Sequence, residues 1–515
     1  MRLCAGDQMR SFFSAIIVVP LLVVTVARAA CGATYIVPDD RTFVEQADLI
    51  VRGTVLVSSS RFTDEGGIVT TTELSVDEML KGRLSGSRIT IQESGGVAGG
   101  LALVIPGTPR FAPGERVLLF LSRTRDGVWS TLDLGLGKFQ FVSSPSGDLL
   151  VRTGGDGESD VFGFACDGSA WHEPLRDASG FLEFIRDVVA GRPPAEPGYT
   201  RPAAPDCGDS GRSAALQQQY PPSAYVMDIS GVKARWEIFT PPTQEVIFRT
   251  RGAQEGEPDS LGAVDQGLAA WTNDPDSTVQ YRREGTTNAV QAFKRSDGIN
   301  SVLFNDPSDE IDGRFTGSGT LATGGFWADD QNTHMYRGER FATILEADMV
   351  IQNGITLNQT DFAGVLAHEF GHTLAIRHSN EGVPSSNSAL MYSYLTPGMG
   401  PNLQPWDRDA VSTVYSSCIL PAVTMHPASI PVEKGQSTTL KVVASGTPPL
   451  EYQWFKTDGT TVQMVDGNSP QFTTPPLQVT TSYFVRVSNS CGSVDSAVAT
   501  VFIVGPRHRA VRAPH

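Results

Sequence analysis

The sequence predicts a multidomain chain in which an all-β unit, a mixed α and β unit and a second all-β unit follow one another. The 515 residues are too many for one hydrophobic core, and about three domains is the expectation for that length. Short strand-like runs fill the first and last parts, whereas apolar residues at helical spacing appear between them. The composition, with 40% apolar and 19% charged residues, is that of a globular protein.

Residues 1–29 are typical of a secretory signal peptide. Arg2 and Arg10 precede an apolar run, and the small residues Ala27 and Ala29 offer a cleavage site. We therefore expect a secreted, extracellular protein, with a lipoprotein signal at Cys31 as the alternative. No later apolar run approaches the roughly 20 residues that span a bilayer, so we expect no membrane-spanning segment. The net charge of −16 argues against a nucleic-acid partner.

Residues 30–191 contain short strands separated by Gly, Ser and Asp, at intervals suited to an antiparallel barrel or sandwich. A helix with Phe181, Leu182 and Ile185 on one face is expected to close the unit, with Gly191 as its stop. The pattern is similar to the OB-type barrel of netrin and metalloprotease-inhibitor modules. This segment shows no catalytic constellation, so we expect it to be an accessory or pro-domain. Residues 192–222 are rich in proline and predict an extended linker.

The strongest signal lies within residues 223–417, where His368, Glu369 and His372 have the spacing H-E-x-x-H. Two imidazoles one helical turn apart can bind one metal ion, and the neighbouring carboxylate can take a proton from bound water. His378 adds a third ligand, so the sequence predicts one catalytic zinc ion. Three of the eight histidines fall within eleven residues. Thr360 is the expected N-cap of this helix.

A second short motif, Ala-Leu-Met-Tyr ending at Tyr392, follows some thirteen residues after the third histidine and Ser379. Together with the serine after the third histidine, it resembles the metzincin zinc endopeptidases of the matrixin branch. The resemblance implies an α+β catalytic domain, with a twisted mixed sheet and an active-site helix, that cleaves protein or peptide substrates. It implies zinc ligands and a general base at His368, His372, His378 and Glu369, a methionine turn at Met391, and substrate contacts at Thr320, Leu321, Ala322, Tyr392 and Tyr394.

Ala375 stands where the family has glycine, at the point where the helix must end and the chain must turn. An alanine at positive φ costs about 1 kcal/mol. We therefore expect strain at this residue.

Two further features concern regulation and metal binding. Cys207 precedes the metal-binding unit, where matrixins carry a zinc-ligating cysteine that keeps the proenzyme latent, but a disulfide is the commoner fate of a secreted cysteine. Asp306, Asp309, Glu310 and Asp312 could bind Ca²⁺, although their spacing matches no EF-hand loop. We expect a solvated loop there, and Ca²⁺ has no specific motif in its support.

Residues 418–504 resemble an Ig-like β-sandwich with a core tryptophan at Trp454. The usual cysteines between the sheets are missing, and we expect Cys418 to pair with Cys491 instead. Residues 505–515 form a basic tail expected to be disordered.

Two functions remain open at this stage. The first is a secreted zinc endopeptidase, whose N-terminal barrel is a passive spacer or an intramolecular inhibitor. The second is a non-catalytic adhesion or binding protein with a degenerate metzincin scaffold. The retained Glu369 favours the enzyme, because a purely structural zinc site needs no base.

Overall fold

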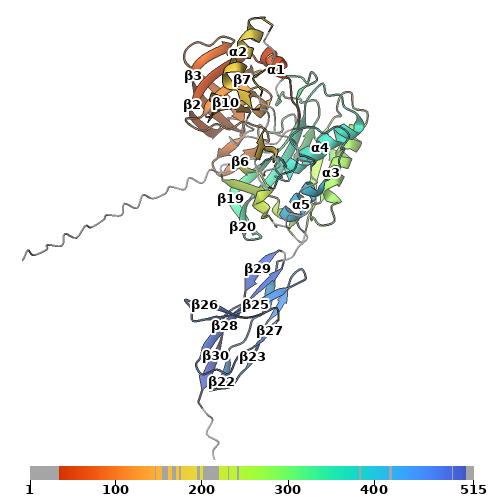
Figure 1. Cartoon of the computed structure of the whole chain (residues 1–515). Helices are drawn as coiled ribbons and strands as arrows, with labels where there is room; N and C mark the ends of the chain where they lie inside the picture. Colours follow the sequence, from red (N-terminus) through yellow and green to blue (C-terminus); the bar gives the residue numbers. More distant parts are fainter. Residues whose placement is uncertain are drawn as a thin grey trace, which may run out of the picture.

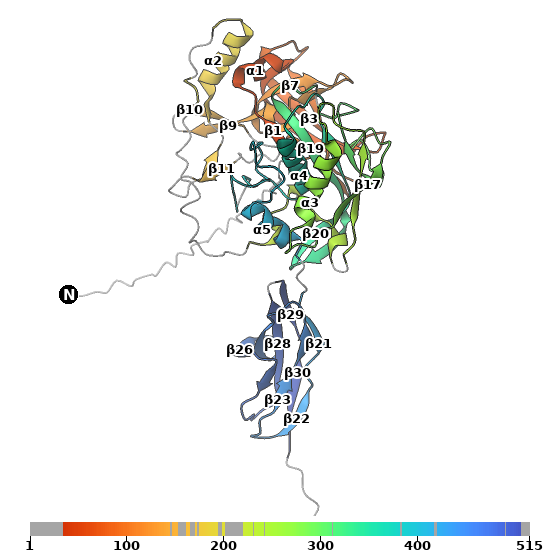
Figure 2. The same cartoon turned by 90° about the vertical axis from the view of Figure 1, so that its right-hand side faces the viewer.

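The structure is a computed structural model that describes residues 34–505 except 145–146, 153–160, 165–169, 173–174, 194–197, 201–219, 230, 241–242, 312, 382–383, 417–419 and 490. Figures 1 and 2 show a barrel, a central sheet with helices, and a separate β-sandwich. The predicted signal peptide lies outside the described residues, as do most of the predicted linker, the tail after Gly505, Asp312, and Cys31, Cys166, Cys207 and Cys418. Among the helices that are described, none is long and apolar enough to cross a membrane.

The N-terminal unit is built around a closed five-stranded barrel, as predicted. Strand β8 closes it by pairing with both β4 and β7. The barrel strands are β2 (Leu49–Phe62), β3 (Ile68–Lys81), β4 (Arg88–Ser94), β7 (Arg116–Arg123) and β8 (Trp129–Thr131). The sheet continues from β7 through β9 (Lys138–Ser144), β10 (Gly147–Arg152) and β13 (Arg176–Asp177), and a hairpin joins β11 (Val161–Phe164) to β12 (Ala170–His172). The likeness to netrin modules stays a prediction.

Two helices complete this unit, α1 (Asp40–Gln46) and α2 (Ala178–Val189). The predicted closing helix is α2. Its residues Phe181, Leu182 and Ile185 are buried, and Gly191 has a φ of 67° just beyond its end. The apolar face that the sequence indicated therefore packs into the core of the barrel unit.

The central unit is a mixed sheet with the helices α3 (Ser260–Thr272), α4 (Gln359–Thr373) and α5 (Pro405–Val414). Its strand order is β17-β16-β18-β20-β19-β6-β5. Strand β19 (Gly319–Tyr336) pairs with β20 (Glu339–Ile351) in the antiparallel direction, whereas β15 and β18 pair with β20, and β16 with β17 and β18, in parallel. The other strands are β14 (Asp228–Ile229), β15 (Val232–Arg235), β16 (Val246–Arg251), β17 (Tyr281–Thr286) and β18 (Asn300–Leu303).

Three strands of this sheet come from the first hundred or so residues of the chain. They are β1 (Thr34–Ile36), β5 (Gly96–Ala98) and β6 (Leu101–Val104). Both β1 and β6 pair with β19 in the antiparallel direction. The residues predicted as a separate N-terminal barrel thus also complete the sheet of the central unit, which the sequence analysis did not anticipate.

The C-terminal unit is an all-β sandwich, as predicted, with a core around Trp454. The valines at 442 and 485, near the positions of the usual cysteines, are buried. Cys491 is buried as well, and its predicted pairing with Cys418 stays a prediction. The strands are β21 (Ala422–Met425), β22 (Ile430–Glu433), β23 (Thr439–Lys441), β24 (Val443–Ser445), β25 (Glu451–Thr457), β26 (Val462–Gly467), β27 (Gln471–Thr473), β28 (Thr481–Asn489), β29 (Gly492–Asp495) and β30 (Ala499–Val504).

Helix α4 is capped differently from the prediction, and all of its residues from Asp361 onward are buried. Asn358 is the N-cap, because its side-chain oxygen accepts the N–H of Asp361 at 3.0 Å. Thr360, the predicted cap, lies inside the first turn. Asp361 places a carboxylate near the positive end of the helix dipole, as expected.

Helix α4 ends in a left-handed turn at Ala375, whose φ is 62°. The N–H of Ala375 donates to the carbonyl of His372 at 2.8 Å, and Ile376 donates to Gly371 at 3.1 Å. Such bonds satisfy the last carbonyls of a helix, and a residue in the left-handed region is what they require. The predicted strain at Ala375 is therefore present.

Backbone pairing on the far side of the turn holds this conformation. Met227 donates its N–H to the carbonyl of Ala375 at 2.8 Å, and Arg377 donates to Tyr225 at 3.0 Å. The loop that carries the third histidine is thus fixed by the chain itself.

Helix α5 begins with a capping box that also supports the methionine turn. The Asp407 carboxylate accepts the N–H groups of Gln404 at 2.8 Å, Leu390 at 2.7 Å and Met391 at 3.0 Å. Asp407 is fully buried, and this burial raises its pKa to about 6. One side chain therefore positions both a helix and the turn beneath the histidines.

We expect Ala375→Gly to raise the free energy of unfolding by at most about 1 kcal/mol, since glycine adopts positive φ without strain. The loss of one buried methyl group offsets part of the gain. Urea unfolding measures the change. Ala363→Gly, at a buried position inside α4, is the matched control and should destabilise by about 1 kcal/mol. Equal destabilisation by both variants would contradict the strain at Ala375.

We expect Asp407 to make stability pH-dependent in acid. Its folded pKa of about 6 lies above the unfolded value of 3.8, so the folded state binds more protons in that window and stability falls as pH rises through it. Asp407→Asn should abolish this contribution. It should also lower the free energy of unfolding at pH 7 by about 1–3 kcal/mol, because an amide nitrogen then faces a backbone N–H. Urea titrations of chelator-treated protein across this pH range test both effects, and identical pH slopes would refute the first.

Candidate metal centre

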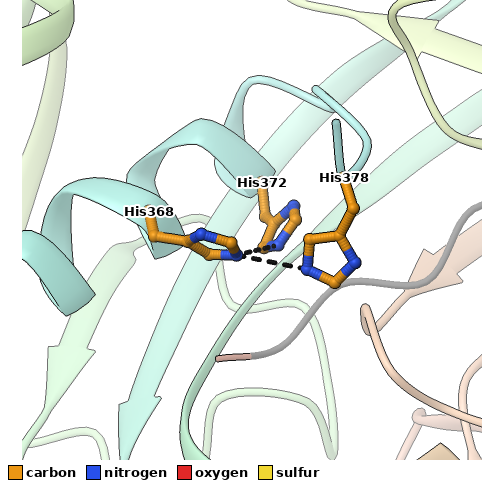
Figure 3. A group of neighbouring side chains, drawn as sticks. All are labelled: His368, His372 and His378. Atoms are coloured by element: carbon orange, nitrogen blue, oxygen red, sulfur yellow. Dashed lines mark hydrogen bonds between the residues drawn. The ribbon is translucent and has the colours of Figure 1, made fainter. Parts of the chain in front are cut away.

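Three imidazoles converge at the end of α4 (Figure 3). His368 and His372 project from one face of the helix, one turn apart, and His378 projects from the loop beyond it. The Nε2 atom of His368 lies 2.9 Å from that of His372 and 3.2 Å from that of His378. All three side chains are buried, at 2% exposure or less. The structure thus brings together the three histidines that the sequence singled out.

The opposite nitrogen of each ring has an oxygen partner. Nδ1 of His368 contacts the carbonyl of Leu390 at 2.7 Å, and Nδ1 of His372 contacts that of Ile376 at 2.9 Å. Nδ1 of His378 lies 2.9 Å from a carboxylate oxygen of Glu381. Since carbonyl and carboxylate oxygens only accept, the proton of each neutral ring belongs on Nδ1.

The Nε2 atoms are therefore three lone pairs that face one another. Burial lowers the pKa of His368 and of His378 to about 3, and burial together with the two neighbouring imidazoles lowers the pKa of His372 well below its usual value. All three rings are neutral near pH 7. Three acceptors at this distance repel one another unless a cation lies between them, and neutral imidazole nitrogen is a preferred zinc ligand. The residues present fit a zinc ion, and they form the one candidate metal cluster among the described residues.

Glu369 lies beside this cluster and is fully buried. One of its carboxylate oxygens accepts the N–H of Thr34 at 3.0 Å and the hydroxyl of Thr34 at 2.6 Å. The other accepts the N–H of Gly324, in β19, at 2.6 Å. Burial raises the pKa of Glu369 to about 8, so its carboxylate is a stronger proton acceptor than an exposed one.

Met391, the predicted residue of the methionine turn, packs against Gly371 of α4. It is fully buried. A Cβ atom at Gly371 would collide with the Met391 sulfur and with the Trp271 ring. The glycine inside the H-E-F-G-H motif is thus required by close packing of the helix on the turn.

The predicted substrate-binding residues border the same region. Thr320, Leu321 and Ala322 lie in β19, and β1 occupies their outer edge. Tyr394 lines a small cavity with His368, and its ring contacts that of Tyr392 at 5.6 Å. Of these residues, Thr320 and Ala322 pair with β1, and Tyr394 shares the small cavity with Thr34 of the same strand. Their role in binding a substrate stays a prediction.

Sequence reasoning missed three residues that contact this site. Glu381 orients His378, and its position three residues further along the chain was a usable signal. Asp407 supports the methionine turn, and its place three residues after Gln404 matches a capping box. Thr34 contacts Glu369 across 335 residues of chain, and no local pattern could have indicated it.

The acidic residues considered for calcium have other partners. Asp306 accepts the N–H groups of Glu310 and Ile311, and the Asp309 carboxylate lies 2.7 Å from Arg125. Glu310 accepts two backbone N–H groups of residues 292 and 293. Asp306 is buried and Glu310 is half-buried, so the expectation of a solvated loop is wrong for both, and Ca²⁺ gains no support from the described residues.

Comparisons with known proteins agree with the motif. Residues 255–416 match the family model of the matrixins, and residues 421–506 match that of the CHU_C-associated Ig-like domain. No curated protein matches the chain.

Among solved structures, matches include a chimeric titin Z1Z2 protein functionalised with a KLER exogenous peptide from decorin, at 22% identity over 18% of this chain and 99% of that chain, with a TM-score of 0.15. The tandem Ig repeats of Dlar match at 18% identity over 17% of this chain and 49% of that chain, with a TM-score of 0.15. Such TM-scores carry no conclusion. The two family models support a conclusion: this chain carries a matrixin domain followed by an Ig-like domain.

Proposed function

We propose that the chain is a secreted, zinc-dependent endopeptidase that cleaves extracellular proteins, with Glu369 as its general base. The matrixin domain supports a zinc metalloprotease of the metzincin type. The observation that carries the finer proposal is the buried Glu369 carboxylate beside three converging neutral imidazoles. A purely structural zinc site has no use for such a base.

The three histidine Nε2 atoms would hold the zinc ion. When bound, zinc would supply Lewis-acid activation of water and of the peptide carbonyl. Glu369 takes the proton of the attacking water and passes it to the amine that leaves. Its burial supports the first transfer by raising its affinity for a proton, and its hydrogen bond to a backbone nitrogen, that of Thr34, supports the second.

The outer edge of β19 supports peptide substrates as the ligand class. An extended peptide pairs with a strand edge through backbone hydrogen bonds and leaves its side chains for the flanking pockets. Thr320–Ala322 on one side and Tyr394 on the other flank β1, and such a peptide would take the place of that strand. Export rests on the signal-like residues 1–29 of the sequence.

Glu369→Gln tests the base. We expect the variant to bind one zinc ion per chain, as the parent does, while proteolysis falls by about 10²–10⁴-fold, because the amide cannot take a proton. Metal analysis and cleavage of casein or gelatin measure the two effects, with a chelator abolishing cleavage by the parent. Cleavage by Glu369→Gln at the rate of the parent would assign the base elsewhere.

Glu381→Ala tests the support of His378. Loss of a carboxylate behind a metal-ligating imidazole weakens metal binding by about 10–100-fold. Zinc competition with a chromophoric chelator measures the affinity. Glu255→Ala, which removes an exposed carboxylate, is the control and should leave the affinity unchanged. Equal affinities for all three proteins would exclude Glu381 from the site.

A further inference from the structure

The first strand of the described chain, β1, lies between the edge of β19 and residues 394–395, and we call the gap that it fills the cleft. Thr34 is only 2% exposed, and both its N–H and its hydroxyl donate to Glu369. A backbone nitrogen within hydrogen-bond reach of the base occupies the place of the amine that leaves in peptide cleavage. Thr34 therefore stands where the residue after a cleaved bond would stand.

The rest of β1 continues in the direction of a bound peptide. Thr34 pairs with Ala322, and Tyr35 with Thr320, so that β1 runs antiparallel to the edge of β19. On its other side, Tyr35 forms a parallel bridge with Tyr394, and its carbonyl accepts the N–H of Leu395 at 3.3 Å. Both walls of the cleft thus bind β1 through its backbone, which is how an extended peptide is held irrespective of its sequence.

The neighbouring part of the same edge is covered as well. Strand β6 pairs with Phe326–Asp329, and the hydroxyl of Thr323 donates to the carbonyl of Pro106 at 3.3 Å. A Cβ atom at Gly325 would collide with the carbonyl of Val104. Strands β1 and β6 thus cover the edge of β19 on both sides of Gly324. The N–H of Gly324 itself donates to Glu369.

The cavity beneath Thr34 is small. It has a volume of about 20 Å³, room for about one water molecule, and it lies between α4 and the loop around Gly400. The backbone atoms of Gly400 lie 3.2–3.3 Å from the place of a Cβ on Gly364, so the floor is close-packed. Threonine fits this space, whereas a long or aromatic side chain would have to displace its walls.

We propose that strand β1 is a tethered, substrate-like ligand of the cleft: it keeps the full chain latent until it leaves, and it marks a site that takes a small residue after the cleaved bond. This inference rests on the proposed peptidase function for its cleavage assay but not for its binding assay. The ligand is an extended peptide with a small residue at its amino end. The tether is the barrel, because the Tyr35 side chain packs into the barrel core.

The test uses the full chain with Thr34→Arg, whose side chain exceeds the cavity and expels β1. We expect its kcat/KM on an external peptide to rise by about 10-fold or more, since β1 loses two hydrogen bonds to a carboxylate. Val37→Arg adds the same charge to an exposed residue of the same segment and should behave like the parent. Thr34→Ser keeps the hydroxyl and the small size and should remain latent.

A second readout needs no catalysis. A peptide with the sequence of residues 34–39, fluorescent at its carboxyl end, should bind Thr34→Arg in anisotropy titrations, with or without zinc, and should not bind the parent. The same peptide with phenylalanine in place of threonine should bind at least about 10-fold more weakly. Equal binding of the threonine peptide to parent and variant would overturn the occupancy of the cleft by β1, and equal binding of both peptides would overturn the small-residue preference.

Failure of the inference is distinguishable from failure of the proposed function. Zinc-loaded protein that cleaves nothing in any variant would refute the peptidase but leave the binding assay decisive. If Thr34→Arg does not fold, hydrogen exchange on the parent decides. The amides of Gly319–Ala322 should then exchange as slowly as those of Phe326–Asp329, and exchange at the rate of an open strand edge would refute the inference.

Discussion

The central unit depends on one constraint: the lone pairs of three buried histidine Nε2 atoms face one another. Neutral imidazoles whose Nε2 atoms are 2.9 and 3.2 Å apart repel one another unless a cation lies between them. The fold maintains them by giving every Nδ1 an oxygen partner and by packing Met391 against the one residue of the motif that has no side chain, Gly371. Asp407 then secures the methionine turn from below. The surrounding hydrogen bonds and packing thus hold the three nitrogens in a mutually repulsive arrangement, and a bound cation would remove that repulsion.

Local features of this site could be predicted because they depend on short spacings. H-E-x-x-H fixes two imidazoles on one helical face whatever the rest of the chain does. The strain at Ala375 was predicted from the resemblance instead, because the family has glycine at this position, and the structure places the residue at a φ of 62°. The N-cap was misplaced by two residues because Asn358 and Thr360 are both good caps, and only the bond to Asp361 decides between them.

Long-range pairing could not be predicted. Nothing in Thr34–Ile36 or Leu101–Val104 distinguishes these short strands from those of the barrel, yet they join a sheet in which the strands from β14 to β20 lie more than a hundred residues later. Strand pairing depends on which edges are left free, and a single sequence does not show that. The sequence reasoning therefore placed the boundary between the two units at the proline-rich linker. In the structure, β1 and β6 of the N-terminal segment pair with β19 of the central unit. The alternative of an intramolecular inhibitor, raised from the sequence without a contact to support it, gains a specific surface from these strands.

Coverage of β19 by β6 also bears on how the chain reaches its native state. A strand edge with unpaired N–H and C=O groups is a template for pairing with other molecules, and apolar edges promote aggregation. Phe326–Asp329 would form such an edge if β6 were absent. Because the chain is synthesised from its amino end, β6 is made more than two hundred residues before β19. The edge thus meets an intramolecular partner that is already present when it emerges, and the N-terminal unit acts as a built-in safeguard for the solubility of the newborn chain.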